Sequence, residues 1–232
     1  MFFKNSTMNK PVYNLTVILL AAGKSERFNG IKLLAKVQQQ ETSTTLLEHA
    51  FHQLSLALNT LNMDKKSIRI ATGRYHSQIT TFFSENKNSQ FFFDYCEDAH
   101  LGLGHTISQS VGHMINGADD NDISTSHILI ALADQIALTA DNYIALIKQS
   151  LALPNMLVCA KAGHEIMPPA IFPATYFADL IHLKGDKGAK SVLYTNKENL
   201  QTVNIPHAER DIDTQQDLIN WHKNTEFSDF YF

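Results

Sequence analysis

Short apolar runs alternate along the chain with segments in which apolar residues recur at every third or fourth position. The apolar runs predict strands at Leu15–Leu20, Ile68–Thr72, Phe91–Tyr95, Ile128–Leu132, Met156–Ala160 and Gln201–Ile205. The segments between them predict helices at Thr45–Leu58, Ser77–Ser84, Thr106–Ile115, Ala140–Leu151, Pro173–Leu183 and Thr214–Trp221. This alternation is typical of βαβ units. We therefore expect an α/β fold with a single three-layer, doubly wound, mostly parallel sheet and helices on both faces.

The length of the chain favours one domain. Its 232 residues, of which 44% are hydrophobic, can bury one sizeable core but are few for two independent ones. We place the domain at residues 15–222, between an N-terminal tail (1–14) and a C-terminal tail (223–232). We interpret residues 116–126 as a polar surface connection, and we expect the aromatic end of the chain, residues 227–232, to pack on the body or on a partner.

Composition excludes several classes of function. The formal net charge is −4, and scattered lysines and arginines provide no track for a nucleic acid. The apolar runs are far shorter than the roughly 20 residues that a membrane helix needs, and the first residues lack the pattern of a secretory signal. The two cysteines, Cys96 and Cys159, have neither metal-site nor disulfide spacing. We expect a cytoplasmic protein with no nucleic-acid or membrane partner.

The segment after the first predicted strand is the first candidate for chemistry, because ligands of such sheets bind beyond the carboxyl ends of the strands. It reads LAAGKSERFNGIK over residues 20–32. A P-loop would need a glycine where Ile18 stands, and the loop's glycines also miss the dinucleotide-binding spacing. The loop does carry small residues that let a backbone approach a nucleotide, and it offers Ser25, Arg27 and Lys32 as polyphosphate donors. The alternative is a solvated turn with ordinary surface cations.

Several blocks, in order, resemble the molybdenum cofactor cytidylyltransferase family, within the wider group of molybdopterin-guanylyltransferase-like nucleotidyltransferases. The blocks are LAAGKSERFNGIK (20–32), GLGHTI (102–107), LADQ (132–135), PAIFP (169–173), LKGDKGAK (183–190) and DIDTQQDL (211–218). The resemblance covers roughly residues 15–222, and it implies a Rossmann-like nucleotidyltransferase fold. The chain departs from the family pattern in four places: one extra residue between Arg27 and Gly30, Ile136 and Gln215 in place of prolines, and Cys96-Glu97 where Asn-Pro is common.

The resemblance implies catalytic roles for two cationic side chains. Lys32 would neutralise charge on the α-phosphate while the acceptor oxygen attacks it and pyrophosphate leaves. Arg27, with the backbone after Gly23, would hold the β- and γ-phosphates. No covalent intermediate with the protein is needed.

The resemblance also implies a Mg²⁺ site. Asp134 follows the predicted strand Ile128–Leu132, which suits a metal ligand at the ligand-binding edge of the sheet, and carboxylate oxygens suit this ion. Asp211 or Asp213 would supply the second carboxylate. The alternative for either residue is a position before the last predicted helix, where a negative charge is favoured by the helix dipole.

We expect the nucleotide to contact small residues of two segments. These residues are Ala21, Ala22, Gly23, Ser25, Gly102, Gly104 and Thr106. Gly102 and Gly104 would open the helix Thr106–Ile115, whose free N–H groups could bind a phosphate or a nucleotide edge. A histidine such as His105 is more often a capping or surface residue than a ligand contact. The resemblance assigns residues 185–188 to the side of the acceptor.

The base is expected to be cytosine. Cytidylyl members of the group read Ala-Ala-Gly where guanylyl members read Ala-Gly-Gly, and the methyl group of Ala22 would crowd a purine. The expected reaction joins CTP to a molybdopterin-type phosphorylated acceptor and releases pyrophosphate with Mg²⁺. A recipient molybdoenzyme or its chaperone would be a further partner. Two alternatives stay open: transfer of another NTP to a sugar phosphate or other phosphorylated acceptor, and a non-catalytic cofactor-delivery module.

Overall fold

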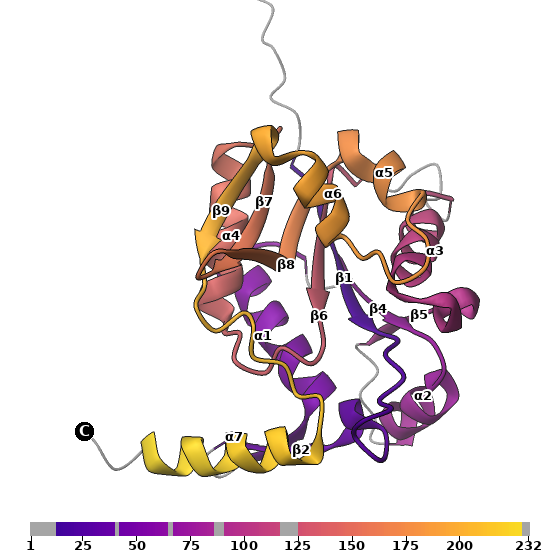
Figure 1. Cartoon of the computed structure of the whole chain (residues 1–232), viewed down its shortest axis with the longest axis vertical. Coiled ribbons are helices and arrows are strands. Elements are labelled where there is room, and N and C mark those ends of the chain that lie inside the picture. Colours follow the sequence, from indigo (N-terminus) through magenta and orange to yellow (C-terminus); the bar gives the residue numbers. More distant parts are fainter. Residues whose placement is uncertain (1–12, 40–41, 65–66, 86–90, 117–124, 229–232) are drawn as a thin grey trace, which may run out of the picture.

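A seven-stranded sheet forms the centre of the protein in the computed structural model, which describes residues 13–39, 42–64, 67–85, 91–116 and 125–228 (Figure 1). The strand order is β5-β4-β1-β6-β8-β7-β9. The strands are β1 (Leu15–Ala21), β4 (Ile68–Thr72), β5 (Phe92–Tyr95), β6 (His127–Leu132), β7 (Leu157–Ala162), β8 (Glu165–Pro173) and β9 (Leu200–Asn204). β1 pairs in parallel with both β4 and β6, so the first strand lies inside the sheet.

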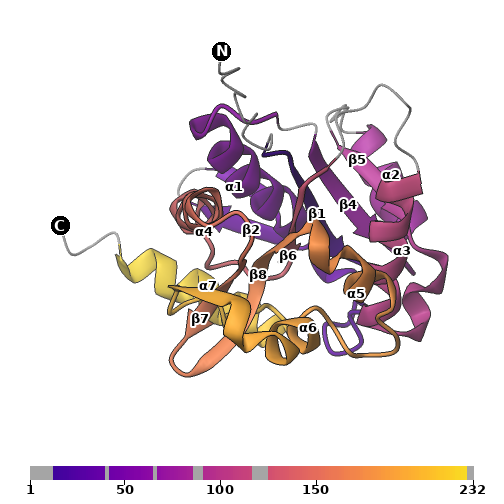
Figure 2. The same cartoon turned by 90° about the horizontal axis from the view of Figure 1, so that it is seen from above.

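Helices cover both faces of this sheet. α1 (Leu46–Thr60), α2 (His76–Glu85) and α4 (Ala140–Ala152) contribute to one core, whereas α3 (Leu103–Asn116), α5 (Phe177–Ile181) and α6 (Lys190–Thr195) contribute to the other. Along β1, Val17 and Leu19 pack in the first core while Ile18 and Leu20 pack in the second, as the two-residue period of a strand requires. Figure 2 shows α1 and α4 on one side of the sheet and α3, α5 and α6 on the other. The predicted three-layer, mostly parallel α/β fold is confirmed.

One strand of the seven-stranded sheet was not predicted, and neither was a separate two-stranded sheet. β8 runs antiparallel to both β6 and β7, in a stretch where Pro168 and Pro169 interrupt the apolar pattern. The helix predicted from Pro173 is therefore wrong at its start, because Pro173 ends β8. A short 3-10 turn, η4 (Ala174–Tyr176), follows, and α5 begins at Phe177.

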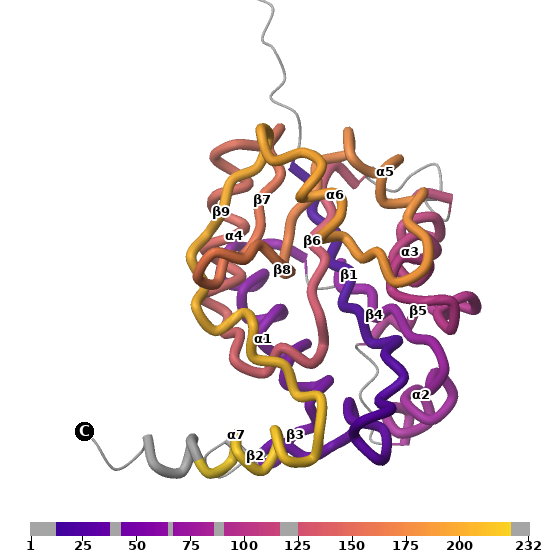
Figure 3. The backbone as a smooth tube through the Cα atoms, viewed as in Figure 1, coloured from indigo at the N-terminus to yellow at the C-terminus, as the bar shows by residue number. Residues whose placement is uncertain are grey.

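A second, two-stranded sheet of β2 (Lys36–Gln39) and β3 (Thr42–Thr45) precedes α1. The last helix, α7 (Gln215–Ser228), lies beside β2 at one end of the molecule (Figure 3). α7 extends beyond the predicted end at Trp221, so the tail predicted from residue 223 begins inside this helix. Residues 1–12 and 229–232 of the predicted tails, and residues 117–124 of the predicted connection, lie outside the described residues. None of the helices in the described ranges is long and apolar enough to cross a bilayer.

Candidate functional site

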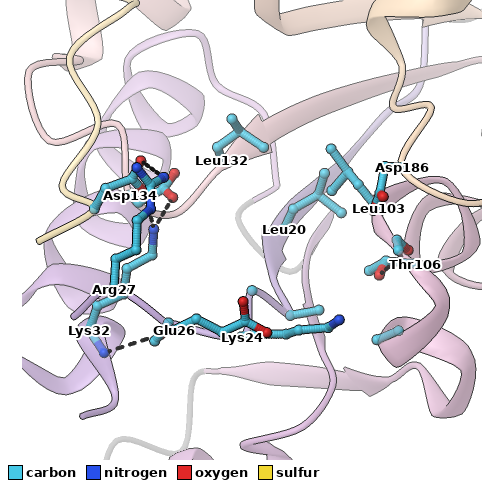
Figure 4. Close-up of a pocket in the computed structure, with 16 residues that line it drawn as sticks. Leu20, Lys24, Glu26, Arg27, Lys32, Leu103, Thr106, Leu132, Asp134 and Asp186 are labelled. Atoms are coloured by element: carbon cyan, nitrogen blue, oxygen red, sulfur yellow. Dashed lines mark hydrogen bonds and ion pairs between the residues drawn. The ribbon is translucent and has the colours of Figure 1, made fainter. Parts of the chain in front are cut away.

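A cavity of about 600 Å³ opens at the carboxyl ends of β1 and β6 (Figure 4). Many of the predicted site residues line it, namely Ala22, Gly23, Ser25, Arg27, Lys32, Gly102, Thr106, Asp134 and Asp213. Ala21, Gly104 and Asp211 are not among the lining residues. Four segments therefore meet around one space: the first glycine loop (residues 22–32), the start of α3, and two acidic segments, which contain Asp134 after β6 and Asp213 before α7. The topological rule for these sheets leads one to expect such a site.

The first glycine loop is tied down from both sides. Phe28 is buried beneath it, and its N–H donates to the Ser25 carbonyl oxygen at 3.0 Å. The Tyr75 hydroxyl donates to the Lys24 carbonyl oxygen at 3.1 Å, and the Gln215 side-chain amide donates to the Phe28 carbonyl oxygen at 3.1 Å. These contacts hold the loop beside the cavity.

Asn29 accommodates the extra residue of this loop. Its φ of 54° lies in the left-handed region, which Asn tolerates better than most residues because its short side chain can hydrogen-bond locally. The chain then continues through Gly30, with a φ of 146°, to bring Lys32 back to the cavity. The insertion relative to the family pattern is thus absorbed within the turn.

Lys32 connects the two acidic segments. Its Nζ lies 2.6 Å from Asp134 Oδ2 and 3.1 Å from Asp213 Oδ1, and the Lys32 side chain is buried. Burial opposes the charged form of Lys32, but the ion pairs with Asp134 and Asp213 outweigh it and raise the pKa of the ammonium. Arg27 Nη2 lies 2.5 Å from Asp213 Oδ2 on the exposed side of the cluster. Both predicted catalytic cations therefore contact predicted metal-site carboxylates.

A backbone hydrogen bond brings the acidic segments together. The Ile212 N–H donates to the Asp134 carbonyl oxygen at 3.0 Å, so the segment after β6 lies against the segment before α7. Asp213 forms an ion pair with Lys32 and lines the cavity, whereas Asp211 does not line it. Partial burial and the charges of Asp134 and Asp213 raise the pKa of Asp211 to about 7, against the opposing effect of Lys32.

Neither Asp211 nor Asp213 caps α7. The Asp217 carboxylate accepts from the Thr214 N–H at 2.7 Å, and the Asp217 N–H donates to the Thr214 hydroxyl at 3.1 Å. This reciprocal pair has the form of a capping box. Thr214 and Asp217 form the side-chain cap of α7, and Asp211 and Asp213 precede this helix start.

The donor set fits a hard divalent cation. Asp134 Oδ1 is a buried atom that has no hydrogen-bond partner among the described residues, although such oxygens are normally satisfied. In the described part of the chain, no group of three or more His, Cys, Asp and Glu side chains gathers as a metal cluster. Mg²⁺ is commonly held by one or two carboxylates together with substrate phosphates, so Asp134 and Asp213 can suffice with a nucleotide.

The start of α3 differs from the prediction. The Gly104 N–H donates to the Gly185 carbonyl oxygen at 2.7 Å, and the Gly102 N–H donates to the Ala99 carbonyl oxygen at 3.2 Å. The helix begins at Leu103 rather than at Thr106, and the N–H groups of Gly102 and Gly104 are both used within the protein. Gly102 and Thr106 still line the cavity, but Gly104 serves the contact with the 184–188 turn.

Sequence reasoning missed several residues of the site. Lys24, Glu26, Ala99 and Leu103 also line the cavity, as does Asp186 from the segment that the resemblance assigns to the acceptor side. The GDKG block points to the segment of Asp186, but no local pattern places that side chain in the same cavity as the first loop. The remaining lining residues carry no spacing signal, because their place depends on which loops pack together.

The arrangement is that of a Rossmann-like nucleotidyltransferase: a nucleotide-sized cavity at the strand ends, with a glycine loop, buried cation and carboxylates around it. The MobA-like NTP transferase domain matches residues 17–202, and the chain belongs to this family. A curated relative, the purine catabolism protein PucB of Bacillus subtilis (strain 168), is 30% identical over 178 residues, which cover 76% of this chain and 78% of PucB.

Solved structures show the same fold. Rv0371c from Mycobacterium tuberculosis H37Rv has a TM-score of 0.70 and 18% identity, covering 92% of this chain and 100% of that one. A complex of Rv0371c with manganese has a TM-score of 0.68 and 17% identity, covering 91% and 99%. Molybdopterin-guanine dinucleotide biosynthesis protein A from Archaeoglobus fulgidus has a TM-score of 0.60 and 13% identity, covering 91% and 99%.

Proposed function

We propose that this nucleotidyltransferase is a Mg²⁺-dependent cytidylyltransferase, which joins CTP to a molybdopterin-type phosphorylated acceptor and releases pyrophosphate. The observation that carries the proposal is the position of Lys32, buried beside the glycine loop and within 2.6 Å of Asp134 and 3.1 Å of Asp213. A cation and two carboxylates at the end of a nucleotide-sized cavity suit transfer of a phosphoryl centre.

The reaction is an in-line displacement at the α-phosphorus of the nucleotide. A phosphate oxygen of the acceptor forms the new P–O bond while the bond to the β-phosphate oxygen breaks, and the electron pair leaves with pyrophosphate. The Lys32 ammonium would neutralise charge on the α-phosphate oxygens, and Arg27 would hold the departing phosphates. Mg²⁺ bound by Asp134 and Asp213 would supply further positive charge to the phosphate oxygens. The manganese complex of Rv0371c, which shares this fold, supports a divalent cation here.

The preference for CTP rests on Ala22. This residue lines the cavity, as does Ala99, and Gly73 packs close to both methyl groups. A Cβ built on Gly73 would lie 2.5 Å from the Ala99 Cβ and 3.1 Å from the Ala22 Cβ. Gly73, Ala99 and Ala22 are therefore closely packed at this side of the cavity. Such close packing leaves the Ala22 methyl group, which a glycine would lack, in the space of the ligand and supports exclusion of the larger purine base.

The assignment of a molybdopterin-type acceptor rests on the family resemblance of the sequence blocks and on the name of the Archaeoglobus fulgidus neighbour. Pyrophosphate release measured with each of the four NTPs, with and without molybdenum cofactor, tests the proposal. We expect release only with cofactor present, and fastest with CTP. Equal release with a sugar phosphate would favour the broader NTP transferase alternative, and no release with any NTP and acceptor would favour a cofactor-delivery module.

A further inference from the structure

Two segments far apart in the sequence are joined backbone to backbone at the rim of the cavity. They are the GLGH segment, residues 102–105, and the turn at residues 184–188. The Gly104 N–H donates to the Gly185 carbonyl oxygen at 2.7 Å, and the Gly185 N–H donates to His105 Nδ1 at 2.9 Å. Both polar groups of the Gly185 backbone are therefore held by the start of α3.

Glycines make this approach close enough. A Cβ on Gly102 would lie 2.5 Å from the Gly185 carbonyl oxygen and 2.6 Å from Asp186 Oδ1, and a Cβ on Gly104 would lie 2.7 Å from the Lys187 carbonyl oxygen. Gly185 itself has a φ of 60°, in the region that favours glycine. The turn can occupy this place only because these positions lack side chains.

The consequence of the contact is the location of Asp186. Its carboxylate lines the cavity together with Leu103 and Thr106, on the opposite side from Arg27 and Lys32 (Figure 4). No hydrogen bond from the described residues reaches this carboxylate, whereas Asp134 and Asp213 are paired with Lys32. The cavity therefore has one end where Arg27 and Lys32 are paired with carboxylates and, across from it, an end with one carboxylate that no described residue pairs.

An ionised carboxylate accepts hydrogen bonds but donates none, and it repels phosphate oxygens. The phosphates of a ligand would lie at the Lys32 end, which leaves an uncharged part of the ligand near Asp186. We propose that Asp186 recognises the N–H donors of an aminopyrimidine edge, and that His105 positions Asp186 by holding Gly185. This inference rests on the proposed function. Both the cytosine of CTP and a pterin acceptor carry such an edge.

Binding measurements on Asp186→Ala test the recognition role and tell the two sources apart. CTP affinity would be followed by calorimetry, and affinity for a pterin monophosphate by pterin fluorescence. We expect one of the two dissociation constants to rise about tenfold, the scale of a lost hydrogen bond to a charged group. A rise for CTP assigns Asp186 to the base, and a rise for the pterin assigns it to the acceptor.

Asp179→Ala is the matched control, because it removes the carboxylate of an exposed aspartate in α5 that does not line the cavity. Its two dissociation constants should equal those of the wild type. If Asp186→Ala also leaves both constants unchanged, the inference is overturned. These readouts do not need turnover, so a wild type that binds ligands without releasing pyrophosphate would defeat the proposed function and leave this inference standing.

His105 is tested by a pair of substitutions. Asn places an acceptor near the position of Nδ1, whereas Leu does not. His105→Leu should reproduce the selective rise seen with Asp186→Ala, and His105→Asn should recover most of the affinity. In the Asp186→Ala background, His105→Leu should add nothing, because the two residues act as one unit. Equal loss of affinity for both ligands, or full additivity with Asp186→Ala, would show that His105 has only a general structural role.

Discussion

Lys32 Nζ lies 2.6 Å from Asp134 Oδ2, so the ammonium group occupies the space beside a carboxylate that is proposed to hold Mg²⁺. Asp213 Oδ1 lies 3.1 Å from the same nitrogen. Lys32 thus lies between two carboxylates that would otherwise repel each other, and Arg27 adds a second positive charge at Asp213. The Lys32 ammonium is directed into the cavity where a nucleotide phosphate would lie.

Replacing Lys32 should slow the chemical step. Lys32→Ala is expected to lower kcat by about 10²- to 10³-fold, as when a single preorganised transition-state stabiliser is removed. Lys32→Arg should restore only part of the rate, because a planar guanidinium does not replace a compact ammonium. Single-turnover kinetics at saturating CTP provide the measurement. A kcat within twofold of the wild type, with a raised KM, would show that Lys32 only binds nucleotide.

Lys32 should also compete with a divalent cation when nucleotide is absent. Lys32→Gln is expected to lower the Mn²⁺ dissociation constant at least about tenfold, because a positive charge next to both carboxylates is removed. Electron paramagnetic resonance of free Mn²⁺ measures this constant. Lys24→Gln is the control, since Lys24 lines the same cavity without an ion pair to Asp134 or Asp213. Equal Mn²⁺ affinity in the wild type and Lys32→Gln would contradict the competition.

The carboxylates are expected to differ in importance. Asp134→Asn should abolish Mg²⁺-supported turnover while leaving the melting temperature close to that of the wild type, because it removes charge but little volume. Asp213→Asn should weaken the dependence on Mg²⁺ strongly, whereas Asp211→Asn should change turnover only a few-fold, since Asp211 does not line the cavity. Turnover measured across a Mg²⁺ titration tests all three variants. Normal activity and unchanged Mg²⁺ dependence in Asp134→Asn would exclude it as a ligand.

Ala22 should set the choice of base. We expect CTP to be preferred over GTP by at least about tenfold in kcat/KM, or roughly 1.4 kcal/mol, and Ala22→Gly should reduce this preference. Ala21→Gly removes a methyl group one position earlier, at a residue that does not line the cavity, and should leave the ratio unchanged. Competition between the two nucleotides in one reaction measures the ratio. If the ratio is the same in all three proteins, the base is read elsewhere.

His49 should make the stability of the fold depend on pH. Burial and the nearby His52 lower the pKa of His49, against the opposing effect of its 3.0 Å contact with the Ile136 carbonyl oxygen. A histidine with a lowered folded pKa contributes fully above its unfolded value of about 6.5, and this contribution is lost as the pH falls below that value. The wild type should therefore lose unfolding free energy between about pH 7.5 and about pH 5.

His49→Gln separates this effect from other titrations, because Gln can keep a donor toward Ile136 but does not ionise. Urea unfolding of both proteins at the two pH values measures the difference. The free energy of unfolding should fall less in His49→Gln than in the wild type. Identical losses in the two proteins would assign the acid sensitivity to other groups, such as the buried His127, whose pKa is also lowered by burial.

The sequence by itself determined the layers of the fold and the loops that carry the chemistry. Continuous apolar runs such as those of β1 and β6 require burial on both faces, and the alternating helices leave a parallel sheet as the consistent arrangement. The ligand-binding edge then follows from strand direction. For that reason Lys32 and Asp134 could be placed at one site from local patterns and motif order alone.

Only the tertiary structure decided which groups are paired within that site. Asp213, rather than Asp211, contacts Lys32 because the Ile212 N–H is held by the Asp134 carbonyl oxygen. The Gly104 N–H donates to the Gly185 carbonyl oxygen, and β8 belongs to the sheet despite its prolines. Each outcome depends on a partner remote in sequence. Local periodicity and residue spacing indicate which face of a helix or strand is buried, but they do not predict the distance between two loops.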